Sequence, residues 1–338
     1  MKSAVIITVY KRYKYIDEAL NSVLSQTVKP DQIIIVADDP KKLNNSINAT
    51  VIEADYPQFG KMIFEAVNAL RDDIDIVYFL DDDDVFYRNK IEYINRIFEK
   101  RSDIVTVHNS SQLIDENGNL LNLTWGIPFE VLVNKNNFRK MHHLYPFGLV
   151  NNSSYSTRKE FLAEIKKNLS YIVIGLDEAL LYLSLEHNGL LHIPEKLTMY
   201  RIGTGISTYG KVIDYSKFLE NKNKLVCHYN RILEDYRYLR SLITSCVPCK
   251  KEIQRTILFH ELYLRAENEV FNCDYKAQLS SLSSLLLSSI RYCSDGTISV
   301  KDLYKVTKGV LAQLILGKKK VSEMRSKRDF ARLQNVKT

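Results

Sequence analysis

Apolar residues in the first 100 positions follow two different spacings. Three short runs are apolar at nearly every position, as in strands buried on both faces of a sheet: AVIITVY, QIIIVA and IDIVYFL. Between them, apolar residues recur every three or four positions, which predicts helices in YIDEALNSVLSQT, KMIFEAVNALRD and NKIEYINRIFEK. With TVIEA as a further strand, this alternation predicts an α/β fold, with a mainly parallel, Rossmann-like sheet flanked by helices.

The pattern changes near residue 210. Before it, DIVTVHNSSQLI predicts a strand, GLDEALLYLSLEHNG a helix, and LLHIPEKLTMYRI two strands joined by a proline bend. After it, strand patterns stop and long helical patterns follow. We therefore expect a domain at residues 1–210, a helical C-terminal region at 211–317, and a basic tail at 318–338 that is a candidate for disorder.

Composition narrows the class of protein. Of the 338 residues, 45% are hydrophobic and 26% charged, as in globular proteins, and no run is long enough for a membrane span. The first residues lack a signal-peptide cleavage site, which predicts a cytoplasmic protein. The formal charge is +7, but residues 318–338 hold eight basic and two acidic residues. The remainder is nearly neutral, which argues against a nucleic-acid partner.

Five cysteines lie in the last third of the chain, and only the pair in CVPC is closely spaced. A zinc site would need a second pair or nearby histidines. The odd number is also a poor disulfide framework. We therefore expect buried free thiols.

Four consecutive aspartates, Asp81 to Asp84, directly follow the apolar run IVYFL. Crowded carboxylates repel one another unless a cation neutralises them. Mg²⁺ or Mn²⁺ suits such oxygen ligands, usually with one or two carboxylates plus substrate phosphates. Asp81 to Asp83 thus predict a metal and nucleotide site, whereas Asp84 has an alternative role as a charge before the following helix.

Other polar residues are expected at the same edge of the sheet. Asp38 follows the second strand, and Tyr10 to Arg12 follow the first. In doubly wound sheets, ligands bind beyond the carboxyl ends of the strands. Neither G-x-G-x-x-G nor a Walker sequence is present, so side chains and a metal ion would have to hold a nucleotide.

Four segments, in this order, resemble motifs of the family 2 glycosyltransferases over about residues 3–210. VIITVYKRYKYIDEALNSVLSQT is similar to the opening strand and helix, IIIVADDP to EIIVVDDGS, YFLDDDDVF to FLDxDD, and GLDEALLYLSLEHNGLLHIPEKLTMYRI to the late GEDxxL motif. The resemblance implies a nucleotide-sugar-binding fold with a D-x-D motif. It also implies a metal-dependent, inverting transfer of sugar from a nucleoside diphosphate sugar to a hydroxyl of a glycan, lipid or protein.

The resemblance assigns roles to individual residues. Thr8, Val9 and Tyr10 would line the base pocket, Asp38 would accept a hydrogen bond from the base, Asp81 would lie near the ribose, Asp83 would bind the metal, and Asp177 would be the general base. We place Arg12 and Asp82 in the same nucleotide-sugar site. The family's arginine after the third strand is missing, so Lys61 or Arg201 is the candidate for the diphosphate contact. For Asp177, a charge in the first turn of a helix is the alternative.

The C-terminal segment VTKGVLAQLILGKKKVSEMRSKR has apolar residues on one side and a basic cluster after them. Two interpretations stay open: peripheral contact with an anionic membrane on its cytoplasmic face, or a docked helix with a disordered tail. Two other functions also stay open. One is a non-catalytic, membrane-peripheral scaffold; the other is a nucleotidyltransferase, whose usual glycine-rich loop is missing.

Overall fold

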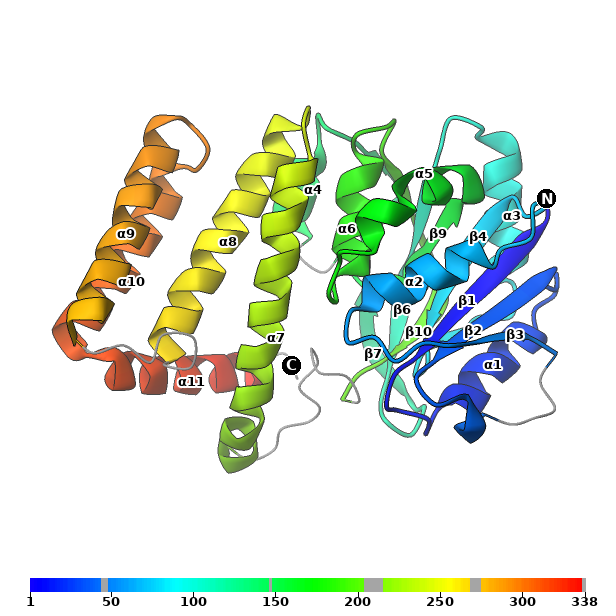
Figure 1. The fold of residues 1–338 in the computed structure, drawn as a ribbon, viewed down its shortest axis with the longest axis horizontal. Coiled ribbons are helices and arrows are strands. Elements are labelled where there is room, and N and C mark those ends of the chain that lie inside the picture. Colours follow the sequence, from blue (N-terminus) through cyan, green and yellow to red (C-terminus); the bar gives the residue numbers. More distant parts are fainter. Residues whose placement is uncertain (44–47, 146–147, 204–214, 268–274, 336–338) are drawn as a thin grey trace. The chain divides into compact units, whose positions relative to one another are not determined.

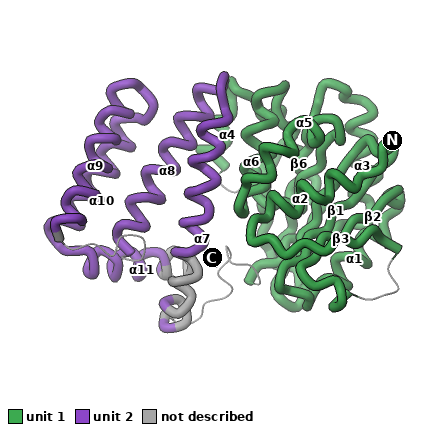
Figure 2. Tube along the Cα trace, viewed as in Figure 1, with its two compact units in different colours: residues 1–204 green, residues 205–338 purple. Residues whose placement is uncertain are grey.

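The computed structural model describes residues 1–43, 48–145, 148–203, 215–267 and 275–335 (Figure 1). The chain divides into two compact units, Met1–Thr204 and Gly205–Thr338 (Figure 2). The predicted boundary near residue 210 lies outside the described residues.

The first unit is built on a ten-stranded sheet in the order β3-β2-β1-β4-β9-β6-β10-β5, with β7 beside β6 and β8 beside β10. The strands β3, β2, β1 and β4 are mutually parallel, and β10 is parallel to β6. The α/β fold is therefore confirmed, and β9 runs antiparallel to both of its neighbours. The strands are β1 Ser3–Val9, β2 Gln32–Ala37, β3 Thr50–Glu53, β4 Ile76–Asp81, β5 Val85–Phe86, β6 Thr106–Ile114, β7 Leu120–Trp125, β8 Val131–Val133, β9 Tyr155–Arg158 and β10 Leu190–Arg201.

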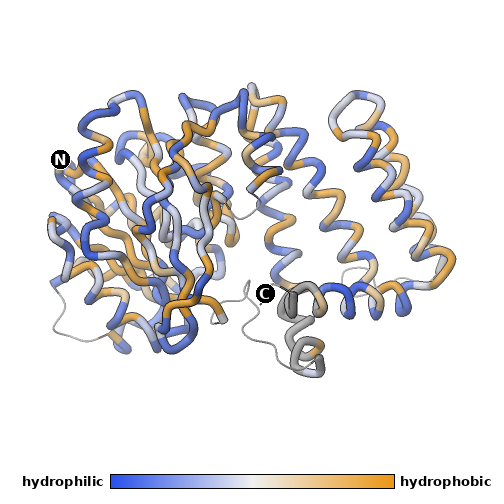
Figure 3. The backbone as a smooth tube through the Cα atoms, turned by 180° about the vertical axis from the view of Figure 1, so that it is seen from behind, coloured by the Kyte–Doolittle hydropathy of each residue, from blue (hydrophilic) through white to orange (hydrophobic). Residues whose placement is uncertain are grey.

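Helices cover both faces of this sheet. Val5 and Ile7 of β1 share a core with α1 and α3, whereas Ala4 and Ile6 point to the opposite face, against which α2 packs. Burial on both faces explains why these strands are continuously apolar, as Figure 3 shows by their colour. The helices of this unit are α1 Ile16–Leu24, α2 Phe59–Asn68, α3 Lys90–Lys100, α4 Phe138–Leu144, α5 Lys159–Leu169 and α6 Leu176–Ser184, with the short η1 Pro40–Lys42 and η2 Asn152–Ser154.

The segment predicted as two strands with a proline bend is one strand, β10. Its pairing with β6 shifts register between Ile193 and Lys196 and again before Thr198. The proline between them, which has no backbone N–H to donate, is therefore accommodated as an irregularity rather than as a strand end.

The second unit is helical throughout its described part. Leu258, Leu262, Leu285 and Val310 belong to its core, and Ser299 forms a capping box with the third residue of α10. Its helices are α7 Tyr215–Leu242, α8 Val247–Glu267, α9 Tyr275–Ser294, α10 Val300–Leu316 and α11 Lys318–Asn335. None of the helices within the described ranges is both long and apolar enough to cross a membrane.

The basic segment from residue 318, which the sequence left as a candidate for disorder, forms the helix α11 as far as Asn335. Val321 is only 5% exposed, and α11 contacts α8 and α10. The high charge of this segment suggested a disordered tail. Burial of a few of its side chains against other helices instead stabilises it as a helix.

The expectation of free thiols was wrong for the CVPC pair. Cys246 and Cys249 form a disulfide at the start of α8, with Cα atoms 5.3 Å apart. A spacing of three residues places both side chains on the same side of a helical turn. Cys227 is free and exposed, and Cys293 is free and half-buried.

The contact between α2 and α5 requires a glycine. A Cβ at Gly60 would lie 1.8 Å from the carbonyl oxygen of Leu169. We predict that Gly60→Ala lowers the free energy of unfolding by about 1–3 kcal/mol, because the added Cβ overpacks the contact. This loss would outweigh the higher intrinsic helix propensity of alanine, which exceeds that of glycine by about 1 kcal/mol. Urea denaturation measures this difference. The control is Glu65→Ala on the same helix, and a Gly60→Ala protein as stable as that control would contradict the packing.

Candidate active site

Parallel pairing brings the ends of three strands together at one edge of the sheet. Thr8 of β1 pairs with Asp81 of β4, and Val9 pairs with Ala37 of β2. Asp38, which follows Ala37, and Asp81 therefore flank the end of β1. The structure thus brings together Thr8, Asp38 and Asp81, three of the residues that the sequence assigns to nucleotide binding.

Asp38 is held in place from the loop after β1. Its Oδ1 accepts hydrogen bonds from the Lys11 backbone N–H and the Tyr13 hydroxyl, both at 2.8 Å. Burial pushes the pKa of Asp38 upward, but these hydrogen bonds outweigh it and lower the pKa below its ordinary value. Lys11 adopts a left-handed φ of 57°, which is unusual for a residue with a side chain. The loop therefore presents Asp38 as a fixed anionic acceptor.

Arg12 neutralises part of the acidic run. Its Nε donates to Asp82 Oδ2 at 3.0 Å, and its Nη1 lies 2.6 Å from Asp83 Oδ2. The side chains of Asp82 and Asp83 are only 6% and 8% exposed. One guanidinium thus contacts two carboxylates that the sequence assigns to the nucleotide and to the metal.

Negative charge nevertheless remains in excess. Burial, and then repulsion from Asp83 and Asp82, raises the pKa of Asp81 to about 7. Burial raises the pKa of Asp82 to about 6 despite the Arg12 contact, and burial also holds the pKa of Asp84 well above its ordinary value. The acidic run therefore favours a further positive charge.

Arg201 is only 1% exposed, so it contacts the acidic run from the interior of the unit and not from the solvent. Its backbone N–H donates to Asp84 Oδ1 at 2.9 Å, and its Nε donates to the Asp83 carbonyl at 2.8 Å. Its Nη2 donates to Glu18 Oε2 at 2.5 Å, and its guanidinium lies 4.4 Å from the centre of the Tyr15 ring. Arg201 is thus occupied by buried contacts to the acidic run, to Glu18 and to Tyr15.

Asn152, in η2, connects the acidic run to α6. Its amide nitrogen donates to Asp81 Oδ2 at 3.3 Å, and its Oδ1 accepts from the Asp177 backbone N–H at 3.0 Å. The backbone N–H of Asn151 in turn donates to Asp177 Oδ2 at 2.9 Å. No motif for nucleotide-sugar binding or catalysis singles out Asn152 in the sequence. Asp177 is therefore part of the same cluster as Asp81, although 96 positions separate them in the sequence.

The remaining predicted residues lie around this cluster in different ways. The Val9 side chain is in the hydrophobic core, so only its backbone is available to a ligand. Tyr10 is half-buried, with Lys11 Nζ 4.8 Å from its ring centre. Lys61 is exposed and lies over the Tyr56 ring at 5.5 Å. Among the described residues, the structure gives Lys61 no contact with the aspartates.

The acidic run fits a divalent cation by its chemistry. Its donors are hard carboxylate oxygens with unbalanced negative charge, which Mg²⁺ and Mn²⁺ prefer. Within the described ranges, no three acidic, histidine or cysteine side chains are grouped as a complete metal site. A metal that takes one or two carboxylates and completes its shell with phosphate oxygens does not need such a group.

The raised pKa of Asp81 predicts an unusual pH dependence of stability. The folded state keeps a proton on Asp81 up to about pH 7, whereas the unfolded chain loses it near pH 4. Without divalent ions, the free energy of unfolding should fall by roughly 1–3 kcal/mol as pH rises through this window. Asp81→Asn should flatten this decline in urea denaturation with EDTA. The exposed Asp72→Asn is the control, and an unchanged slope in Asp81→Asn would contradict the assignment.

Comparisons with known proteins find a family whose model matches part of the chain. Residues 4–157 match the model described as Glycosyl transferase family 2. An uncharacterized glycosyltransferase of Nostoc sp. is 34% identical over 126 residues, which cover 35% of this chain and 38% of that protein. One of Rickettsia conorii is also 34% identical over 126 residues, covering 21% of its own length. The match thus spans less than two fifths of the length of each of these curated relatives.

Solved structures show the same fold over more of the chain. S. aureus TarS 1–349, solved in complex with UDP-GlcNAc, is similar with a TM-score of 0.61 and 15% identity. The match covers 97% of this chain and 92% of that one. The same fragment solved with UDP has a TM-score of 0.57 and 13% identity. The fold and the family match agree with the motifs, and residues 4–157 are similar to the family 2 glycosyltransferases.

Proposed function

We propose that this protein transfers a sugar from a nucleoside diphosphate sugar to a hydroxyl of a glycan, lipid or protein, with inversion at the anomeric carbon. The observation that carries the proposal is the Asn152 bridge, which joins Asp81 to Asp177. A donor-binding carboxylate and a candidate base thereby belong to one site. The match to the family 2 model supports glycosyl transfer, and the related fold of TarS, solved with UDP-GlcNAc, supports a nucleotide-sugar donor.

The nucleotide would bind at the ends of β1 and β2. Asp38, whose lowered pKa keeps it ionised, would accept a hydrogen bond from the base. Thr8, the Val9 backbone and the Tyr10 ring would line the base pocket. Asp81, beside the end of β1, would accept from a ribose hydroxyl.

Asp83, with Asp82, would hold Mn²⁺ or Mg²⁺. Such an ion, when bound, supplies positive charge that stabilises the departing diphosphate. Arg12 already contacts both carboxylates and is the best-placed side chain to face the diphosphate as well. Neither alternative is as well placed, because Arg201 is buried in backbone contacts and Lys61 lies over Tyr56.

Asp177 would act as the general base. The backbone N–H groups of Asn151 and Glu178 donate to its two oxygens at 2.9 and 3.0 Å, which fixes the orientation of the carboxylate. As the acceptor oxygen bonds to the anomeric carbon, its proton passes to Asp177. The bond from that carbon to the diphosphate oxygen breaks on the opposite face, and its electron pair leaves with the diphosphate. This single displacement requires no covalent enzyme intermediate.

We also propose peripheral contact with the cytoplasmic face of an anionic membrane through the second unit. Leu311 and Ile315 of α10 are 49% and 76% exposed, and the adjoining α11 is rich in lysine and arginine. Apolar side chains beside a basic helix are the combination that binds anionic lipid surfaces.

Substitution of Asp83 and Asp177 should separate binding from chemistry. We expect Asp83→Ala to lose metal-dependent donor binding, and Asp177→Asn to keep it while losing at least about a hundredfold in transfer. Calorimetry with UDP, GDP or TDP and Mn²⁺ measures binding. Donor hydrolysis over the corresponding sugars, together with transfer to added acceptors, measures turnover.

Asp72→Asn, on the exposed surface, is the matched control and should behave as wild type. Metal-independent binding in the wild type would remove the metal from the proposal. Turnover by Asp177→Asn at the wild-type rate would contradict the assignment of Asp177 as the general base. Absence of any donor binding by the wild type would favour the non-catalytic scaffold.

Asn152→Ala tests the bridge itself. Without the amide, Asp177 loses one fixing contact and Asp81 loses a donor. We predict that kcat falls about tenfold while KM for the donor changes less, because the effect acts mainly on the orientation of the base. Steady-state kinetics measure both parameters. A rise in KM with unchanged kcat would place Asn152 in donor binding alone.

A further inference from the structure

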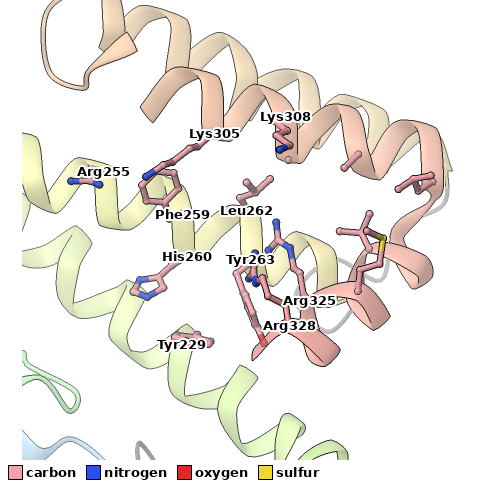
Figure 4. Close-up of a pocket in the computed structure, with 15 residues that line it drawn as sticks. Tyr229, Arg255, Phe259, His260, Leu262, Tyr263, Lys305, Lys308, Arg325 and Arg328 are labelled. Atoms are coloured by element: carbon pink, nitrogen blue, oxygen red, sulfur yellow. The ribbon is translucent and has the colours of Figure 1, made fainter. Parts of the chain in front are cut away.

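The helical unit contains a cavity of about 860 Å³ that the transfer reaction does not use. Figure 4 shows residues of α7, α8, α10 and α11 around it. The volume falls within the range of small-molecule binding pockets. The lining combines basic, aromatic and aliphatic residues: Tyr229, Arg255, Phe259, His260, Leu262, Tyr263, Lys305, Lys308, Gly309, Ala312, Leu316, Val321, Met324, Arg325 and Arg328.

Five of these lining residues are cations and none is acidic. Two have carboxylate partners outside the lining: Arg255 Nε lies 2.9 Å from Asp302, and Arg328 Nη2 lies 3.0 Å from Asp329. Lys305, Lys308 and Arg325 form no ion pair with any carboxylate of the described chain. Glu267 and Asp329 act on Arg325 electrostatically without forming an ion pair with it, so the cavity lining keeps cations that are not paired within the described part of the chain.

Arg325 is the most confined of these unpaired cations. Burial, followed by repulsion from Arg328, lowers its pKa, and its guanidinium lies 5.7 Å from the Tyr263 ring centre. Figure 4 labels Lys308 of α10, Arg325 of α11 and Leu262 of α8 among the residues that line this space. Two like charges facing one space are stabilised by an anion between them.

The other part of the lining is apolar. Leu316 and Met324 line the cavity and remain 40% and 55% exposed, and Val321 lies between them in the chain. Leu311 and Ile315, on α10 beside the lining residues Ala312 and Leu316, are also exposed. An anion alone would leave this apolar surface in water, whereas an apolar chain attached to the anion would cover it.

We propose that this cavity binds a phosphate group that carries an apolar chain, with the phosphate between Lys308 and Arg325 and the chain along Leu316 and Met324. Arginine and lysine together suit a phosphate because they supply several charge-assisted hydrogen bonds. The proposal adds a specific lipid site to the membrane contact proposed above, on which it partly rests, and it is independent of the transfer site.

The test measures binding of the full chain to monomeric dihexanoyl phosphatidic acid by calorimetry. The double variant Lys308→Gln/Arg325→Gln should bind at least about tenfold more weakly than wild type. The control Lys301→Gln/Arg291→Gln removes one lysine and one arginine of the same unit that do not line the cavity, and it should bind as wild type. Equal losses in the two variants would mean general charge attraction and would overturn the site.

The apolar part of the proposed site, at Leu316 and Met324, is tested by a separate comparison. Wild type should bind the lipid phosphate at least about tenfold more tightly than inorganic phosphate. Leu316→Ser, at an exposed position that does not threaten folding, should weaken lipid phosphate binding and leave inorganic phosphate binding unchanged. Equal affinity of wild type for the two ligands would overturn the apolar half of the proposal.

Vesicles distinguish the source of the phosphate. Phosphatidylcholine vesicles containing phosphatidic acid should sediment the wild type, and the pocket variant should sediment less than the charge control. If wild type binds the monomer but not the vesicles, the ligand is a soluble lipid phosphate and the proposed membrane contact fails while the site stands. Binding to neither overturns both.

Discussion

The crowding of four carboxylates at the end of one strand, with Asp81 half-buried and Asp82 to Asp84 buried, is the constraint on which the candidate site depends. Such a run is stable only if positive charge and hydrogen bonds compensate it. Arg201 fixes its backbone from the interior, and Arg12, from the loop after β1, contacts Asp82 and Asp83. The compensation is incomplete, since burial, and then repulsion from Asp83 and Asp82, keeps the pKa of Asp81 near 7. This residual negative charge is what would attract a metal ion and, through it, a diphosphate.

The antiparallel strand β9 gives the site its second half. Tyr78 of β4 pairs with Ser156 of β9, so the residues that precede β9 lie beside the end of β4. Ser153 Oγ therefore reaches the Asp81 backbone N–H at 2.9 Å, and Asn152 reaches the Asp81 side chain. A parallel strand at this position would have put η2 at the opposite edge of the sheet. The mixed pairing is thus what joins the acidic run to Asp177.

The sequence predicted the parallel half of the fold well and the connections less well. Continuous apolar runs such as IIIVA predict strands buried on both faces of a doubly wound sheet. The ends of these runs placed Asp38 and Asp81 at the carboxyl ends of β2 and β4, where the structure has them. Asn152 was missed because β9 is only four residues long, and its polar sequence has no distinctive period. Arg201 looked available for a diphosphate because sequence cannot show burial of a cation. The cavity of the second unit was missed because its lining comes from separate helices.

A crystal structure grown with Mn²⁺ and UDP tests the central claim most directly. The account predicts a metal ion bound to Asp83 and bridging the diphosphate, with the base of the nucleotide at Asp38 and Arg12 turned toward the phosphates. A nucleotide bound away from the ends of β1 and β4, or at those ends with Arg12 still paired to Asp82 and Asp83 and no metal present, would contradict it.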